Sequence, residues 1–206
     1  MIPSLNNFFA LLGIDVMLCA VVLRLLSWSS KANAWAPWVT AALFFALWLP
    51  VGPVQLPVLA YVRGVSSDLS ITLVALACLA LWRGIFKGPP VRDREKALLF
   101  FTTTAGGVLL YPLALGLGNW DAYRLGWGAP GLWLVLLVIA VVARLKKFWL
   151  LPLLLALALL AWTAGVFEST NLWDYLLDPW LFLMAFVYCI KTLFSTVRGG
   201  LSLPPV

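Results

Sequence analysis

The chain has 206 residues, of which 64% are hydrophobic and 11% are charged, and its net charge is +6. An ordinary soluble domain is about 45–50% apolar and about 25% charged. A chain of this length cannot bury so much apolar surface in a single core, so the composition argues against a soluble protein and predicts an integral membrane protein.

Residue types that usually carry chemistry are scarce. The sequence contains no His, which excludes His-ligated metal sites and His-dependent nucleophilic catalysis. Its cysteines, Cys19, Cys78 and Cys189, are too few for a cysteine-only metal cluster, and their odd number argues against a disulfide framework. We interpret them as small core residues, expect no metal and no cofactor, and assign the basic charge to membrane topology rather than to nucleic-acid binding.

Seven apolar stretches are candidates for membrane-spanning helices, since a span needs about 20 mainly apolar residues. In chain order they cover residues 8–26, 35–54, 69–86, 97–117, 130–144, 148–167 and 180–197. Each stretch is continuously apolar rather than alternating, which predicts helices and not strands. We therefore expect an all-α, polytopic membrane helix bundle that forms a single transmembrane domain over residues 1–206, with no soluble domain.

The basic residues near the span ends predict the orientation. The first span lacks a basic segment before it, so we expect a permanent span and not a cleavable signal peptide. If the N-terminus is outside, the outer side holds only Arg63 and Arg124. The other twelve cations then lie near the inner side: Arg24, Lys31, Arg83, Lys87, Arg92, Arg94, Lys96, Arg144, Lys146, Lys147, Lys191 and Arg198. This segregation predicts a multi-pass protein of the cell (inner) membrane with a cytoplasmic C-terminus.

The second span is interrupted by Pro50, Pro53 and Pro57, which cannot continue a straight helix. One interpretation is a helix that ends near Leu49 and is followed by a segment at the outer interface. The other is a broken or re-entrant element that lines a cavity, as in some transporters.

Three outer loops combine acidic, basic and aromatic residues. Their candidate ligand- or partner-binding residues are Arg63, Asp68, Asp121, Tyr123, Arg124, Glu168, Trp173 and Asp174. The loops form either an outward-facing pocket for a polar headgroup, a saccharide or a partner loop, or a purely structural surface. In the structural interpretation the rings lie at the bilayer interface, the two arginines pair with Asp68 and Asp121, and Asp178 caps the last helix.

Several residues within the spans are also informative. Asp15 lies about halfway along the first span and should face other helices or water, either in an interhelical hydrogen bond or as a proton-titrating group. Lys191 should extend to the inner interface. We expect the small and hydroxyl residues of the fourth span, together with Gly13 and Gly165, to allow close helix packing.

These features leave three functional hypotheses. The first is a non-catalytic membrane subunit or accessory protein, of bacterial cell-envelope machinery, that packs against another membrane protein or a second copy of itself. The second is a small transporter or flippase that uses Asp15 and the second span. The third is an enzyme acting on a lipid-linked phosphate or sugar at the outer face, with the loop carboxylates as acid, base or ion ligands.

Overall fold

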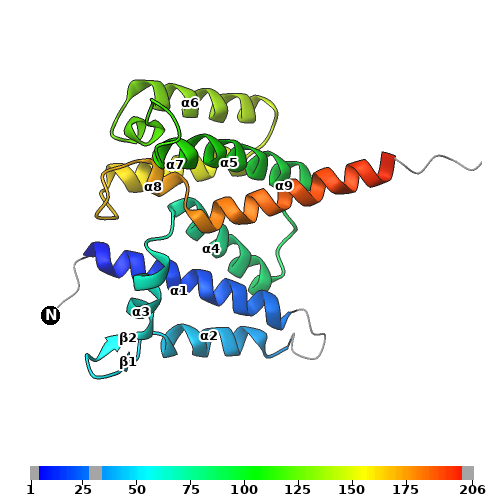
Figure 1. The fold of residues 1–206 in the computed structure, drawn as a ribbon. Coiled ribbons are helices and arrows are strands. Elements are labelled where there is room, and N and C mark those ends of the chain that lie inside the picture. Colours follow the sequence, from blue (N-terminus) through cyan, green and yellow to red (C-terminus); the bar gives the residue numbers. More distant parts are fainter. Residues whose placement is uncertain (1–4, 28–33, 201–206) are drawn as a thin grey trace, which may run out of the picture. The chain divides into compact units, whose positions relative to one another are not determined.

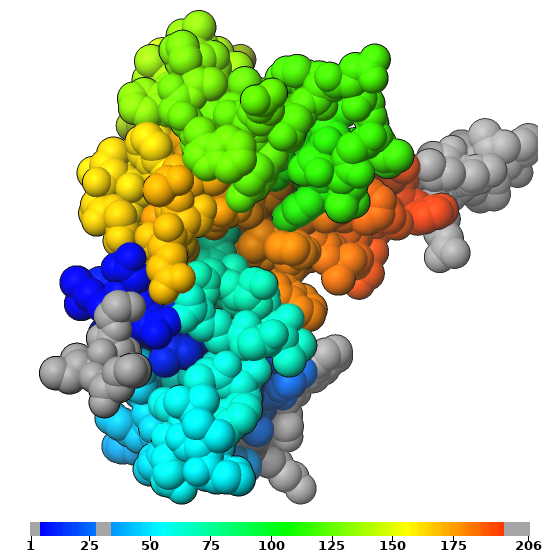
Figure 2. Space-filling model, turned by 60° about the vertical axis from the view of Figure 1, so that its left-hand side comes forward, coloured from blue at the N-terminus to red at the C-terminus, as the bar shows by residue number. Residues whose placement is uncertain are grey.

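The structure is a computed structural model that describes residues 5–27 and 34–200, with the side chains described as far as Ser195 (Figure 1). Most of these residues are helical, as the sequence predicts. Lys31 and the side chain of Arg198, both used in the orientation argument, lie outside the described part. The chain, drawn as a space-filling view in Figure 2, divides into two compact units, and it crosses from one unit to the other three times. The single domain expected over residues 1–206 stays a prediction.

Unit 1 comprises Met1–Pro90 and Leu154–Leu176, and unit 2 comprises Val91–Leu153 and Leu177–Val206. The elements of unit 1 are α1 (Leu5–Leu26), α2 (Ala36–Ala46), β1 (Pro50–Val51), β2 (Leu56–Pro57), α3 (Val58–Ser66), α4 (Ile71–Phe86) and α8 (Trp173–Leu176). Those of unit 2 are α5 (Asp93–Ala114), the short 3-10 helix η1 (Ala122–Gly126), α6 (Pro130–Leu145) and α9 (Pro179–Gly200). Helix α7 (Leu150–Thr163) begins in unit 2 and continues in unit 1.

Each of the seven apolar stretches overlaps a helix. Two of the described helices, α1 and α5, are long and apolar enough to cross a membrane by length and composition, which points to membrane association. The other apolar helices are shorter, and a helix rises about 1.5 Å per residue against a hydrocarbon core of about 30 Å. The arrangement of seven spans therefore stays a prediction.

The second stretch is helical only over α2, so the expected span of residues 35–54 is too long. The chain instead forms a two-stranded antiparallel hairpin in which Pro50 is opposite Pro57. Proline has no N–H to donate to a helix, and the hairpin turn has Gly52 and Gln55 at positive φ. The Tyr61 hydroxyl closes the element by donating to the Val51 carbonyl at 3.2 Å.

In unit 1, α1 contacts α2, α3 and α4 (Figure 1). Close approach to α4 depends on two glycines, because a Cβ on Gly13 would lie 2.9 Å from Val74 Cγ2 and one on Gly84 would lie 2.6 Å from Leu23 Cδ2. The packing role predicted for Gly13 is confirmed. That of Gly165 is wrong: it has φ +62 after the end of α7 and nothing within 4 Å of its added Cβ, so it serves the turn.

In unit 2, α5 packs against α9. A Cβ on Gly107 would lie 2.1 Å from Phe182 Cδ2, and the Thr104 hydroxyl lies 3.3 Å from the Cys189 sulfur. Gly107 and Thr104 of the fourth stretch therefore lie at a helix–helix contact, as predicted, whereas Gly106 has nothing within 4 Å of an added Cβ.

Candidate functional site

Asp15 is fully buried on α1 in unit 1. Its Oδ2 accepts a hydrogen bond from the Trp48 indole Nε1 at 2.7 Å, just after α2 ends. The Cys19 thiol, one turn further along α1, lies 3.5 Å from Oδ1 and 3.7 Å from the Thr40 carbonyl on α2. The predicted hydrogen bond between Asp15 and a neighbouring segment is thus present, and it joins α1 to the end of α2.

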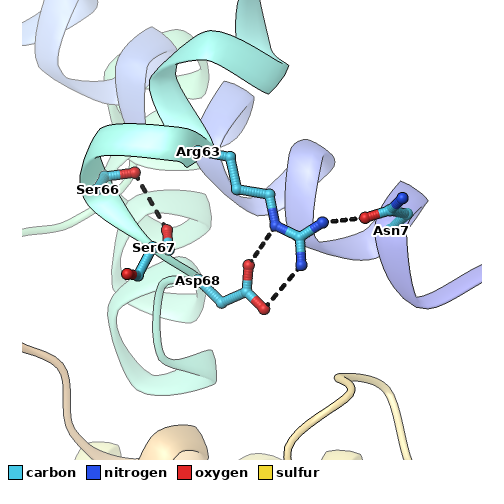
Figure 3. A network of polar contacts seen from close by, with 5 residues as sticks. All are labelled: Asn7, Arg63, Ser66, Ser67 and Asp68. Carbon is cyan, nitrogen blue, oxygen red and sulfur yellow. Dashed lines mark hydrogen bonds and ion pairs between the residues drawn. The ribbon is translucent and has the colours of Figure 1, made fainter.

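The Arg63 side chain is held between two elements of unit 1 (Figure 3). Its Nε and Nη2 donate to the two oxygens of Asp68 at 2.6 and 3.1 Å, and Nη1 donates to the Asn7 side chain on α1. This fork-to-fork geometry is the strong form of the arginine–carboxylate pair. The predicted Arg63–Asp68 pair is confirmed, and Asn7 is a partner that the sequence analysis missed.

Charge and hydrogen bonding keep this arginine cationic. The hydrogen bond to Asp68 raises the pKa of the Arg63 guanidinium above its ordinary value, and the negative charges of Asp68 and Glu168 act in the same direction, while burial opposes them. The Arg63 and Asp68 side chains are 23% and 30% exposed, so the pair lies at the surface of unit 1. With Asn7, the Arg63–Asp68 pair holds together α1, α3 and the loop before α4.

The loop between α7 and α8 is organised around Tyr175, which is fully buried. Its hydroxyl donates to the Ser169 carbonyl at 3.0 Å and accepts from the Phe167 N–H at 3.1 Å. Burial raises the pKa of the Tyr175 phenol, and the charges of Asp174 and Asp68 raise it further. Candidate residues from two outer loops therefore gather in unit 1 around Arg63 and Tyr175.

Two of the other predicted residues of this loop, Asp174 and Trp173, serve its structure. The Ser169 hydroxyl donates to the Asp174 carboxylate, and Trp173 is buried, with its N–H donating to the Asn171 side chain at 2.9 Å. Glu168 is exposed. The helix cap predicted for Asp178, at the start of α9 in unit 2, is confirmed, because its Oδ1 accepts from the Leu181 N–H at 2.9 Å.

The middle outer loop belongs to unit 2. Asp121 precedes η1, and its side chain accepts from the Tyr123 N–H at 2.9 Å. The Tyr123 ring meets Trp127 edge-on, with centroids 5.2 Å apart. Arg124 is exposed, and the ion pairs of the described residues do not include the predicted pair with Asp121. Asp121 is instead used as a cap.

Glu95 is the main polar residue that the sequence analysis missed as a buried group. It lies in the first turn of α5 and is 1% exposed. Its carboxylate accepts from the Leu150 N–H at 2.9 Å and the Trp149 N–H at 3.3 Å, at the start of α7. The first N–H groups of a helix have no partner within the helix, so Glu95 satisfies two of them and places a negative charge at the positive end of α7.

The predicted site residues are thus divided between the units: Asp15, Arg63, Asp68, Glu168, Trp173 and Asp174 belong to unit 1, and Asp121, Tyr123 and Arg124 to unit 2. Within the described part of the chain, no group of three or more Cys, Asp or Glu side chains could hold a metal ion. Comparison of the chain with protein families, with curated proteins and with solved structures finds no match.

Proposed function

We propose that this chain is a seven-span protein of the inner membrane, with the N-terminus outside and the C-terminus in the cytoplasm. In this proposal it acts as a non-catalytic subunit or accessory protein of bacterial cell-envelope machinery, and binds another membrane protein through its apolar helix faces.

The observation that carries the proposal is the surface of α6. Only three of its residues, Leu132, Leu136 and Ala143, are buried. Large apolar side chains remain exposed around the helix: Trp133, Leu134, Val135, Leu137, Val138, Val141, Val142 and Leu145. A helix that is apolar on every side belongs in lipid or against another apolar surface.

The polar residues of unit 1 add support, because they hold elements of the fold together. Asp15 joins α1 to the end of α2, and Arg63 and Asp68 join α3 and the following loop to Asn7 on α1. A carboxylate or guanidinium engaged in this way positions helices and needs no substrate to satisfy it.

The positions of cations at helix ends support the orientation. Arg24 lies in the last turn of α1 and Arg83 in the last turn of α4, and Figure 1 shows these two helices running side by side in the same direction. Helix α2, which lies between α1 and α4 in the sequence, runs in the opposite direction (Figure 1). Arg24 and Arg83 therefore both lie at the helix ends that the proposal places in the cytoplasm.

Cysteine labelling tests the topology. In a background with Cys19, Cys78 and Cys189 replaced by Ser, single cysteines are introduced at Pro90 and Asn119, and intact cells are treated with a membrane-impermeant maleimide. We expect labelling at residue 119 and none at residue 90 until the membrane is permeabilised. Labelling of both from the same side would contradict the seven-span arrangement.

Site-specific photocrosslinking tests the partner. A photoreactive amino acid at Val138, 51% exposed on α6, is expected to crosslink another membrane protein. The matched control is Leu136 on the same helix, which is 8% exposed and should give no crosslink. A protein that is active when purified alone, with no crosslink at residue 138, would contradict an accessory role.

One observation favours the transporter or flippase as a second candidate. The buried Asp15 is bonded to Trp48 at the place where α2 stops and the hairpin begins, so an ionisable group lies beside a broken helix. Transport by the reconstituted protein that depends on Asp15 would support this function, and transport that survives Asp15→Asn would contradict it. Catalysis by the outer carboxylates remains a prediction, tested by replacing each with Ala.

A further inference from the structure

Two basic segments of unit 2, distant in the sequence, are held together by one buried carboxylate. Glu95 lies between Arg94 and Lys96 at the start of α5, and it accepts hydrogen bonds from the N–H groups of Trp149 and Leu150. The turn between α6 and α7, with Arg144, Lys146 and Lys147, directly precedes these two residues. The Glu95 bonds therefore bring both basic segments to one place in the unit.

The combined surface is strongly positive. We call it the basic platform, and its residues are Arg92, Arg94, Lys96, Arg144, Lys146 and Lys147. Asp93 and Glu95 are the only acids in the two segments, which leaves a net charge of +4. In the described part of the chain Lys96 is the one platform cation with an ion pair, to Asp93 at 2.9 Å. Arg92, Arg94, Arg144, Lys146 and Lys147 are all exposed.

One residue of this turn has a backbone conformation that residues other than glycine rarely adopt. Lys147 has φ +62, the left-handed conformation that glycine adopts most readily at the end of a helix. The turn around it is well ordered by hydrogen bonds, from Phe148 N–H to the Ala143 carbonyl at 2.9 Å and from Arg144 Nη1 to the Phe148 carbonyl at 3.2 Å. Lys147 therefore occupies a backbone position that suits glycine, and its side chain is exposed.

An aromatic residue completes the surface. Trp149 follows the turn and is 42% exposed. Tryptophan is enriched at the level of lipid headgroups, where its apolar ring and its N–H are both accommodated. Clusters of four to eight Lys and Arg beside a membrane helix attract anionic headgroups, and each cation contributes about 1 kcal/mol.

From this juxtaposition we infer that the basic platform is a binding site for the phosphate headgroup of an acidic phospholipid in the inner leaflet. The lipid is favoured over an acidic protein segment because the cations are joined by an exposed Trp and flanked by the apolar α6. This inference rests on the proposed membrane orientation, which places the α6–α7 turn and the start of α5 at the cytoplasmic surface.

Lipid titration of the full-length protein in detergent, followed by native mass spectrometry, tests the inference. The probes are diphosphatidylglycerol and phosphatidylglycerol, with zwitterionic phosphatidylethanolamine as the reference. We expect both acidic lipids to be retained more strongly than the reference, and more weakly as salt is raised. The Lys146→Gln/Lys147→Gly variant should bind acidic lipid about 25-fold more weakly, about fivefold for each charge removed.

Two further variants separate a site from general attraction. Lys191→Gln removes one exposed cation of α9 outside the platform and should change acidic-lipid affinity less than twofold. Lys147→Gly alone should lower lipid affinity about fivefold while leaving the thermal stability equal or higher, because glycine suits the left-handed backbone there. If the variant lost affinity only because it unfolds, both its lipid affinity and its thermal stability would decrease.

Several results would overturn the inference. These are unchanged affinity in the double variant, an equal loss in Lys191→Gln, or retention of lipid together with loss of a co-purifying protein, which would make an acidic protein segment the occupant. The titration is done in detergent, so its outcome does not depend on topology. Failure of the cysteine labelling test contradicts the proposed function, whereas a correctly labelled protein with no platform-dependent lipid binding contradicts only this inference.

Discussion

The two units satisfy a buried carboxylate in different ways. In unit 1, Asp15 is met by side chains, the Trp48 indole at 2.7 Å and the Cys19 thiol at 3.5 Å. In unit 2, Glu95 is met by backbone N–H groups of Trp149 and Leu150 at the start of α7. Side-chain donors disappear when they are substituted, but backbone donors remain. Losing the Glu95 side chain therefore leaves two backbone donors without an acceptor, whereas losing the Trp48 indole leaves the Asp15 carboxylate with only the weak thiol donor.

The largest expected effect comes from Glu95→Ala, which we expect to lower the free energy of unfolding by about 3 kcal/mol, since hydrogen bonds to a charged group contribute about 1.5–3 kcal/mol each. Glu95→Gln, which keeps one acceptor, should cost about half as much. Denaturant titration in micelles, followed by circular dichroism, measures both. The control is Asp93→Ala, whose exposed ion pair with Lys96 is worth about 0.5 kcal/mol or less. Equal costs for positions 93 and 95 would contradict the buried clamp.

The next effect concerns helix packing, where both units depend on glycine. Gly107→Ala should destabilise unit 2 by about 2 kcal/mol, because the added methyl group overlaps Phe182 at 2.1 Å and α5 must move from α9. The neighbouring Gly106 has nothing within 4 Å of an added Cβ, so Gly106→Ala should be neutral or slightly stabilising. The same titration distinguishes them, and a stable Gly107→Ala protein would show that the α5–α9 contact is looser than described.

A smaller effect is expected in unit 1. Trp48→Phe keeps an aromatic ring tilted against Phe8 but removes the donor to Asp15, and should cost about 1 kcal/mol, in the range of single hydrogen bonds between membrane helices. Trp38→Phe is the matched control, because Trp38 lies on α2 and is 77% exposed. If both substitutions are equally mild, the Asp15 bond contributes little, and Asp15 becomes a stronger candidate for a titrating role.

The last expected effect appears only at alkaline pH and involves the ionisation of Tyr175. Because the pKa of this phenol is raised in the folded state, the unfolded chain ionises first, near pH 10. The stability it contributes is therefore fully present below about pH 10 and is lost as pH rises through the folded-state pKa. We expect the unfolding free energy to fall more steeply above pH 10 in the natural protein than in Tyr175→Phe. Parallel pH profiles for the two proteins would contradict this.

Residues that interrupt a pattern were the ones that sequence reasoning could find. Asp15 breaks an apolar run, and Pro50, Pro53 and Pro57 break a helix, so the sequence alone identifies both features. Glu95 stands among Arg92, Asp93, Arg94 and Lys96, where a charged side chain looks like ordinary solvent exposure. Its burial depends on the α6–α7 turn, some 50 residues further along the chain, and nothing local to the segment signals that contact.

The outer loops also show what residue spacing in the sequence cannot predict. Arg63 and Asp68 are five residues apart, and their pairing could be predicted because a short loop brings them together. Arg124 and Asp121 are only three residues apart, yet Asp121 caps η1, where its side chain accepts from the Tyr123 N–H at 2.9 Å. Spacing alone does not decide between two donors that compete for one carboxylate.

Hydrophobic runs, helix-breaking prolines and the placement of cations are properties of neighbouring residues. For that reason the amino-acid order alone determined the helical class and the approximate positions of the long apolar helices, but not those of α3, η1 and α8. Tertiary structure decided which polar groups are buried, which glycines allow two helices to touch, and how the expected site residues are divided between the units. Those outcomes depend on contacts between segments that are far apart in the chain. Such contacts form, and contribute to the free energy of folding, only when the helices pack.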